Sequence, residues 1–255
     1  MTNRSDVPRP SIDEELIAML RYLRLGRLLA HWEETLETAR KGRYSSERLL
    51  QYIVQEEYRT KRENARLLRR QRANIPEMLE IETFPFDKQP KLDRRRVMSL
   101  YDSFDYITQQ RGVIFLGPTG CGKTGLATSF LLQAIDRGYR GYFITFPELI
   151  QELFQSQADR SERKVLRRYL SYDCLVIDEV GYVEVEPAQV GQFFTLMHKR
   201  HRKKTTIITS NLGFSDWGSF LKNPQLTAAL ADRLTSNSHV INMKDCESLR
   251  GRIDQ

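Results

Sequence analysis

The chain has 255 residues, 40% of them apolar and 10% aromatic, which suffices for one full α/β domain with a smaller appendage and argues against intrinsic disorder. Its 40 Lys and Arg against 33 Asp and Glu give a net charge of +7, so DNA or RNA is one candidate partner and a merely solvated basic surface is the alternative. Cys121, Cys174 and Cys246 are too few and too far apart for a disulfide framework or a Cys/His zinc site, and a reduced, cytoplasmic location is expected.

The first dozen residues are polar and contain Pro8 and Pro10, so we expect a flexible tail there. They include no apolar segment of the kind that a secretion signal needs. Nowhere does the chain approach the roughly 18 consecutive apolar residues that span a membrane. The sequence therefore predicts no membrane partner.

Apolar residues at helical spacing follow the tail and predict a small all-α domain, assigned with the tail to residues 1–82. Gly42 interrupts the pattern, and Ser45 or Ser46 can cap a new helix. The residues of that helix expected to face inward are Leu49, Leu50, Ile53, Val54 and Tyr58.

The end of this helix is strongly basic, with seven Lys or Arg and one acid, Glu63, between residues 59 and 72. A charge run is usually a solvated helix face. Salt-bridged surface helices alternate their charges, however, so the excess of one sign favours contact with phosphates. The residues of this stretch assigned to DNA are Arg59, Lys61, Arg62, Arg66, Arg69 and Arg70.

Residues 83–97 carry Pro85 and Pro90 without a clear helical period and are expected to form an extended linker. The second domain is assigned to residues 98–255. Apolar strands and amphipathic helices alternate there, which predicts a parallel five-stranded sheet covered on both faces. The expected strands are 113–116, 142–145, 175–177, 206–209 and 240–241.

Residues 117–124, GPTGCGKT, match GxxxxGK[ST] and lie between a predicted strand and a predicted helix. Glycines let such a loop curl so that its N–H groups and the helix N-terminus point at phosphate oxygens. Lys123 would neutralise the β- and γ-phosphates, and the Thr124 hydroxyl would ligate Mg²⁺. A chance glycine turn is disfavoured by the strand–loop–helix setting. The ATP-binding residues expected from the loop are Gly117, Pro118, Thr119, Gly120, Cys121, Gly122, Lys123, Thr124 and Gly125.

Two further strand ends carry polar residues that suit the same site. Asp178 and Glu179 follow an apolar strand 55 residues after Lys123 (178 − 123); Asp178 would bind the nucleotide's Mg²⁺ through water, and Glu179 would act as general base. Asn211, after the next strand, would hydrogen-bond the γ-phosphate and the attacking water. A turn-forming asparagine is the alternative.

These motifs resemble those of AAA+ ATPases, and the segment Ala231-Asp232-Arg233-Leu234 is similar to box VII of that family. The resemblance implies that Arg233 reaches the γ-phosphate bound to a neighbouring subunit. Such an arginine finger is worth about 10³–10⁵ in rate, so activity would depend on homo-oligomer formation. The alternative for Arg233 is a salt bridge on a helix surface.

Within the AAA+ group the chain resembles the IstB-like helper ATPases of insertion sequences and, next, the DnaC helicase loader. The similar segments are YRTKRENARLLRR, FPFDKQPKLDRRRV, GPTGCGKT, ITSNLGFSDW and ADRLTSNSHVINMKDCESLRGR. The resemblance implies an ATPase that oligomerises on double-stranded DNA, deforms it and presents it to a partner transposase. DnaC-like helicase loading, with a preference for single strands, is the alternative.

The chain departs from the IstB-like pattern at two places. Asp178-Glu179 stands where such chains often carry two aspartates, a change compatible with hydrolysis. Ser248-Leu249-Arg250 stands for the family's Ser-Tyr-Arg or Ser-Met-Arg, and Arg250 is included in the expected nucleotide-binding set as a second sensor. Because 12 residues follow Met243 (255 − 243), we expect an AAA+ core without a C-terminal helical lid.

Two more basic groups are candidates for sequence-tolerant, salt-sensitive contact with the DNA backbone. One lies on the insertion after the second strand, which in this branch faces a central pore, and the other precedes the fourth strand. Their members are Arg160, Lys164, Arg168, Lys199, Arg202, Lys203 and Lys204.

Two other classes of function fit the sequence less well. A small-molecule kinase would need acceptor-binding residues and an arginine-bearing lid, and neither is evident. A DNA-binding switch that holds ATP without hydrolysing it is disfavoured by Glu179, which is placed to activate water.

Overall fold

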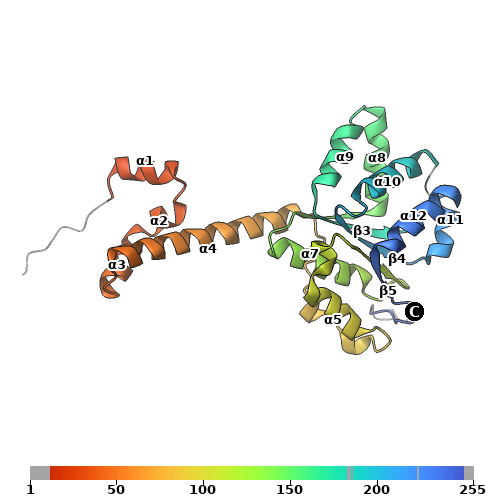
Figure 1. The fold of residues 1–255 in the computed structure, drawn as a ribbon, viewed down its shortest axis with the longest axis horizontal. Helices are drawn as coiled ribbons and strands as arrows, with labels where there is room; N and C mark the ends of the chain where they lie inside the picture. The colour runs from red at the N-terminus through yellow and green to blue at the C-terminus, as the bar shows by residue number, and fades with distance from the viewer. Residues whose placement is uncertain (1–11, 183–184, 186, 223, 250–255) are drawn as a thin grey trace, which may run out of the picture. The chain divides into compact units, whose positions relative to one another are not determined.

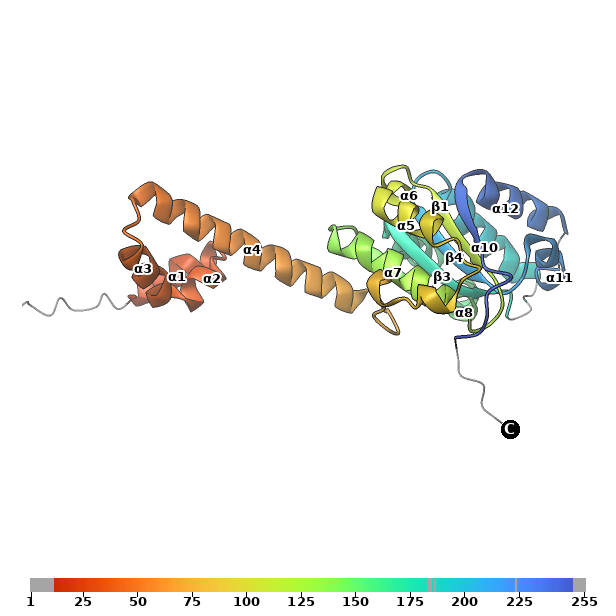
Figure 2. The same cartoon turned by 90° about the horizontal axis from the view of Figure 1, so that it is seen from below.

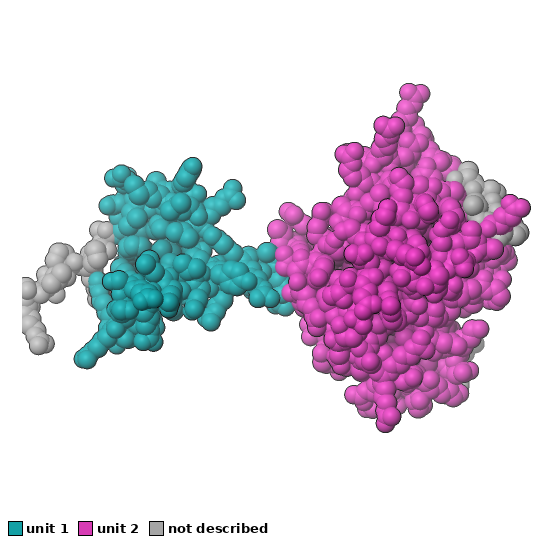
Figure 3. Space-filling model, in the orientation of Figure 1, with its two compact units in different colours: residues 1–67 teal, residues 68–255 magenta. Residues whose placement is uncertain are grey.

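The computed structural model describes residues 12–182, 185, 187–222 and 224–249 (Figures 1 and 2). It divides into two compact units, residues 1–67 and 68–255 (Figure 3). The division lies inside a long helix and not at residue 82. The reason is that Ala73 and Ile81 belong to the apolar core of the second unit, and the Ala73 carbonyl accepts a hydrogen bond from the Phe143 N–H at 2.8 Å.

The first unit consists of three short helices and the first part of α4. Their bounds are α1 Glu14–Tyr22, α2 Gly26–Ala30, α3 Trp32–Lys41 and α4 Ser46–Arg72. Asp13 caps α1 by accepting a hydrogen bond from the Leu16 N–H at 2.6 Å, and Ser45 caps α4 through the Arg48 N–H at 3.2 Å.

The buried face of α4 is narrower than the sequence predicted. Leu50, Val54 and Tyr58 are 62–66% exposed, whereas Glu57 is buried and accepts a hydrogen bond from the Leu28 N–H at 2.8 Å. Three short helices cover only one stripe of a long helix, and apolar spacing alone does not say how wide that stripe is.

The second unit is built on a five-stranded parallel sheet in the order β2-β3-β4-β1-β5, which confirms the predicted fold class. The strands are β1 Gly112–Leu116, β2 Gly141–Thr145, β3 Cys174–Val180, β4 Thr205–Ser210 and β5 Ser238–Asn242. The three central strands are almost wholly buried because helices pack on both faces of the sheet.

Alternate residues of β1 belong to two different apolar cores, as the period of a strand requires. Val113 and Phe115 pack in one core with Ala73, and Ile114 and Leu116 pack in the other. The helices of this unit are α5 Arg94–Ser103, α6 Asp105–Thr108, α7 Lys123–Asp136, α8 Phe146–Ala158, α9 Glu162–Ser171, α10 Pro187–Arg200, α11 Trp217–Phe220 and α12 Pro224–Ser236. None of the helices in the described residues combines the length and the apolar character that crossing a bilayer requires.

The segment expected to be an extended linker, 83–97, is a packed part of the second unit. It contains the 3₁₀ turn η2 (Phe86–Lys88), preceded by η1 (Ile81–Thr83), and Arg94 begins α5. Phe84 and Phe86 pack against the core that contains Val113. Prolines without a helical period describe an irregular segment, but they do not distinguish a packed one from a free one.

Candidate functional site

The loop between β1 and α7 requires glycine at several positions. Gly120 and Gly122 have φ values of +83° and +97°, which side chains rarely allow. A Cβ at Gly117 would lie 2.6 Å from the Met243 carbonyl oxygen, and one at Gly120 would lie 2.4 Å from Ser248 Oγ. Gly122 precedes α7 and offers no side-chain cap, so the first N–H groups of α7 remain available for an anion.

Lys123 begins α7, and its side chain turns back along the loop. Its Nζ donates hydrogen bonds to the carbonyl oxygens of Gly117 and Pro118, both at 2.8 Å, and the residue is 8% exposed. The ammonium is therefore held within the loop. The neighbouring Cys121 is fully buried, and burial raises the pKa of its thiol, which keeps the thiol protonated.

The Asp178 carboxylate at the end of β3 lies beside Thr124 of α7. The Thr124 hydroxyl lies 3.1 and 3.0 Å from the two carboxylate oxygens, and the Thr209 hydroxyl donates a further hydrogen bond. Asp178 is 4% exposed. Burial raises the pKa of Asp178, against the hydrogen bonds from Thr209 and Thr124 and the charge of Lys123, which lower it.

Glu179 adopts a strained backbone conformation directly after Asp178. Its φ is +62°, which is uncommon for a residue other than glycine. The pairing of β3 with β4 is irregular between Ile177 and Val180, and the Glu179 N–H donates to Thr209 Oγ1 at 2.9 Å. In a regular strand, the side chains of Asp178 and Glu179 would point to opposite faces of the sheet. The bulge interrupts this alternation of side chains.

Asn211 follows β4, which lies between β3 and β1. Its side-chain Oδ1 is buried and has no hydrogen-bond partner within the described part of the chain. Leaving a buried acceptor unsatisfied costs about 1–3 kcal/mol. The amide therefore presents an acceptor that water or a ligand could satisfy.

Two residues that contact the loop were missed in the sequence. The Tyr182 hydroxyl lies 2.8 Å from Thr119 Oγ1, and Gln89 Nε2 donates to the Cys121 carbonyl at 3.2 Å. Neither was assigned to the nucleotide site. Tyr182 could have been suspected because it follows Asp178 closely, and Gln89 lies in the segment FPFDKQPKLDRRRV, whose resemblance to the family gave it no role.

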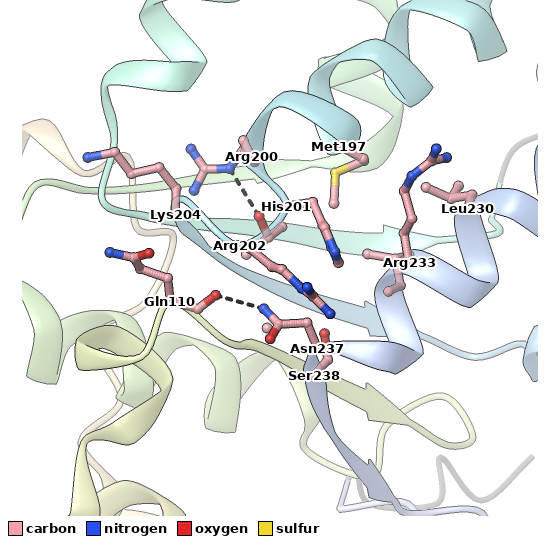
Figure 4. Close-up of a pocket in the computed structure, with 13 residues that line it drawn as sticks. Gln110, Met197, Arg200, His201, Arg202, Lys204, Leu230, Arg233, Asn237 and Ser238 are labelled. Carbon is pink, nitrogen blue, oxygen red and sulfur yellow. Dashed lines mark hydrogen bonds between the residues drawn. The ribbon is translucent and has the colours of Figure 1, made fainter.

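Arg233 lies on α12, away from the glycine loop. It lines a pocket at the amino ends of β1, β4 and β5, together with His201 and Arg202 (Figure 4). Its guanidinium carbon lies 4.8 Å from the centre of the Phe194 ring. Its Nη1 is buried and lacks a hydrogen-bond partner among the residues described, and no ion pair of Arg233 occurs among them either. Burial, with the charges of Arg202 and Arg233, lowers the pKa of His201, although the charge of Asp232 raises it.

Two arginines expected on the DNA surface instead attach the end of α4 to α7. Arg70 Nε donates to Asp136 at 2.7 Å, and Arg70 also pairs with Glu80 at 3.5 Å. The hydrogen bond with Asp136 raises the pKa of Arg70, and its side chain is 17% exposed. Arg69 Nε donates to the Ile135 carbonyl at 3.4 Å. Arg70 thus docks the end of α4 on α7 through Asp136.

Three other basic residues of α4 have acidic partners on the same helix, and two of these partners, Glu56 and Glu57, precede the stretch of residues 59–72. The pairs within α4 are Arg59 with Glu56, Lys61 with Glu57 and Arg66 with Glu63. Exposed pairs of this kind are worth only about 0–1 kcal/mol, so these cations can still exchange partners. Arg62 is exposed and has no ion pair within the described ranges.

The remaining DNA candidates lie on two surfaces of the second unit. Arg160, Lys164 and Arg168 are exposed around α9, although Arg168 pairs with Glu152. Lys199, Arg202 and Lys203 are exposed around the turn after α10. Lys204 pairs with Asp173 at 2.5 Å.

Arg200, within the same basic stretch, is a structural residue. It is fully buried and donates to Thr206 Oγ1 at 3.0 Å and to the carbonyl oxygens of Tyr169 and Tyr172 at 2.7 and 2.9 Å.

Arg250, expected in the nucleotide site, lies outside the described residues. The described ranges hold no group of three or more His, Cys, Asp or Glu suited to a metal ion, so a cation at Asp178 would need ligands from its substrate or from water.

Comparison with known proteins agrees with this geometry. The model of the IstB-like ATP binding protein family matches residues 18–255. The IS21 putative ATP-binding protein of Pseudomonas aeruginosa is 34% identical over 232 residues, which cover 90% of this chain and 86% of that protein.

Solved structures show the same fold at lower identity. The DnaC helicase loader is 24% identical with a TM-score of 0.51 and matches 59% of this chain and 87% of its own. AMPPCP-bound DnaA from Aquifex aeolicus is 16% identical with a TM-score of 0.56 and matches 69% of this chain and 53% of its own. The chain therefore belongs to the family of IstB-like ATP binding proteins, on an AAA+ P-loop fold.

Proposed function

We propose that the chain is a Mg²⁺-dependent ATPase that assembles on double-stranded DNA and presents it to a partner transposase. The observation that carries the proposal is the edge of the sheet where β1, β3 and β4 end together. The glycine loop with Lys123, the Thr124–Asp178 pair and the Asn211 Oδ1, which has no partner within the described residues, all lie at these strand ends. Each of the three supports a triphosphate and its metal ion.

The residues present fit a nucleotide with magnesium. Gly120 and Gly122 hold the loop in a conformation that makes its N–H groups available to phosphate oxygens. The Thr124 hydroxyl and the Asp178 carboxylate are oxygen ligands of the kind that Mg²⁺ prefers. Magnesium, when bound, would neutralise the charge that develops on the phosphates.

The same residues support hydrolysis. Glu179 would accept a proton from the attacking water, and its bulged backbone sets its direction independently of Asp178. Asn211 would hold that water through its unsatisfied Oδ1. Glu179 and Asn211 would thus be needed for ATP hydrolysis, whereas ATP binding alone would not need them.

Arg233 supports assembly into an oligomer. It lies at the amino ends of the strands, with a buried donor that lacks a partner within the described residues, whereas its own loop lies at the carboxyl ends. A neighbouring subunit's triphosphate would satisfy this donor. Activity would then require two subunits at each site.

The DNA and transposase parts of the proposal are supported by relatives and by charge. The relative from Pseudomonas aeruginosa is named as an insertion-sequence protein. The net charge of +7 and the exposed cations around α9 and after α10 suit a DNA backbone. Helicase loading remains the second candidate, because the DnaC loader shares the fold.

We expect Lys123→Ala to weaken ATP binding by about 10–100-fold, because it removes a charge-assisted contact worth about 1.5–3 kcal/mol.

Glu179→Gln should leave ATP affinity unchanged and slow hydrolysis by about 10²–10⁴-fold. Titration calorimetry and phosphate release measure the two effects. Lys41→Ala and Glu82→Gln, both at exposed positions, are the matched controls. Negligible turnover of the wild type under all conditions, with and without DNA, would reduce the protein to an ATP-binding switch.

The raised pKa of Asp178 predicts how stability depends on pH. A carboxyl whose pKa is raised by folding contributes stability below its unfolded pKa and loses it as the pH rises through the folded value. At pH 7.5 the nucleotide-free Asp178→Asn variant should therefore melt higher than the wild type, by about 2–4 °C per kcal/mol gained. The difference should shrink as the pH falls toward the ordinary pKa of an aspartate, about 3.9, and Mg²⁺-ATP should stabilise only the wild type strongly.

Asp173→Asn is the matched control for that experiment. Burial raises the pKa of Asp173, but hydrogen bonds from Lys204 and Arg140 outweigh it and lower the pKa. This variant should melt lower than the wild type at pH 7.5. A lower melting temperature for Asp178→Asn as well would contradict the account of the site.

Arg233→Ala should bind ATP normally and lose about 10³-fold or more of the hydrolysis rate. Mixing it with Lys123→Ala should restore part of the activity, because each variant supplies the group that the other lacks. Arg163→Ala, at an exposed position of α9, is the control. Full activity of Arg233→Ala alone would exclude the arginine-finger role.

Duplex DNA should bind with ATP more tightly than single strands, and the affinity should fall steeply with salt. Arg62→Ala and Lys203→Ala should each reduce the slope of log K against log salt by about 0.9. Arg70→Ala should not change the slope, because Arg70 is paired with Asp136. Filter binding over a salt series measures all three, and a strong preference for single strands would favour helicase loading.

A further inference from the structure

Two segments far apart in the sequence cover the glycine loop. A Cβ at Gly122 would lie 2.6 Å from the Phe84 ring, and one at Gly120 would lie 2.4 Å from Ser248 Oγ. The Met243 N–H donates to the Leu116 carbonyl at 2.6 Å, where β1 ends and the loop begins. The loop is thus held between residues 84–89 and residues 243–249.

Gln89 joins these two segments to the loop and to each other. Its Nε2 donates to the carbonyl oxygens of Cys121 at 3.2 Å and of Glu247 at 2.6 Å. Its Oε1 accepts from the Glu247 N–H at 3.1 Å. The residue is 1% exposed, so these contacts satisfy both amide donors and one acceptor lone pair in a place that water does not reach.

The carbonyl groups of two successive loop residues are therefore fixed from this side. Cys121 is held by Gln89, and the Gly120 carbonyl accepts from the Leu249 N–H at 2.9 Å. In a planar trans peptide the carbonyl and the following N–H point in opposite directions, and no cis bond occurs in the described chain. Fixing these carbonyls consequently directs the N–H groups of Cys121 and Gly122 away from the covering segments.

We propose that Gln89 is a positioning residue for phosphate recognition, which orients the loop N–H groups before the nucleotide arrives. The inference rests on the proposed ATP-binding function. A loop already held in its binding conformation loses less freedom when phosphate binds. Gln89 thus acts on the phosphates through the Cys121–Gly122 peptide and touches no nucleotide itself.

The test is Gln89→Met, which keeps the volume and length of the side chain and removes its hydrogen bonds. ATP and ADP should bind about 3–10-fold more weakly, the range expected from losing one net hydrogen bond, whereas adenosine should bind as it does to the wild type. Titration calorimetry on the full chain gives the three affinities. A role in stability alone would not change the ratio of ATP to adenosine affinity.

Gln133→Met is the matched control. Gln133 also makes two buried or partly buried hydrogen bonds, donating to the Tyr101 carbonyl at 2.9 Å and accepting from the Tyr106 hydroxyl at 2.8 Å, but it has no bond to the loop. This variant should lower the melting temperature and leave the ATP-to-adenosine ratio unchanged. If Gln89→Met does not fold, Leu249→Pro is the second test: it removes the N–H bound to the Gly120 carbonyl, and also changes the side chain and fixes φ, and it should show the same selective loss.

The outcomes separate this inference from the function on which it rests. Unchanged ATP affinity in Gln89→Met, or an equal loss for ATP and adenosine, overturns the positioning role. If Lys123→Ala weakens ATP binding while Gln89→Met does not, the nucleotide site stands and the role of Gln89 falls. If Lys123→Ala also has no effect, the site is misassigned and both proposals fall.

Discussion

The buried carboxylate of Asp178 is the group around which the site is organised. It ends β3, accepts from Thr124 of the loop helix α7 and from Thr209 of β4, and thereby joins three elements of the core. A buried anion held mainly by neutral hydroxyls is unfavourable by itself, which is why its pKa rises. A cation bound beside it would remove that penalty. The protein groups around Asp178 thus leave this carboxylate only partly compensated.

Other local rules are broken at the same edge of the sheet. Glu179 has a positive φ, the ladder between β3 and β4 is irregular, and the Asn211 Oδ1 has no partner within the described residues. Departures of this kind are sustained only where the surrounding structure imposes them, and they concentrate at functional sites. The well-packed strands on either side supply that rigidity, because β1, β3 and β4 are almost wholly buried.

The arginines of this basic chain have different roles because their surroundings differ. Arg200 is buried among carbonyl oxygens and supports the fold, and Arg70 docks one helix on another through Asp136. Arg233 stacks on Phe194 with one donor unsatisfied among the described residues, and Arg62 is exposed to solvent. Net charge alone therefore overstates how much of the basic character is available to DNA.

Sequence alone predicted the features whose signals are local. Strand–helix alternation predicted the parallel sheet, which the structure confirms, and the loop motif with its flanking elements predicted a phosphate-binding turn, since glycine spacing and strand ends are read within a few residues. Family resemblance added Arg233, which no local pattern explains.

Tertiary structure decided everything that depends on partners distant in the chain. The packing of residues 83–97 on the core, the exposure of Leu50, the pairing of Arg70 with Asp136 and the bonds of Gln89 all join positions that no local pattern relates. A sequence shows which groups can donate or accept hydrogen bonds and which side chains are apolar enough to be buried. Only the folded chain brings Gln89 to Cys121, 32 residues away, and to Glu247, 158 residues away.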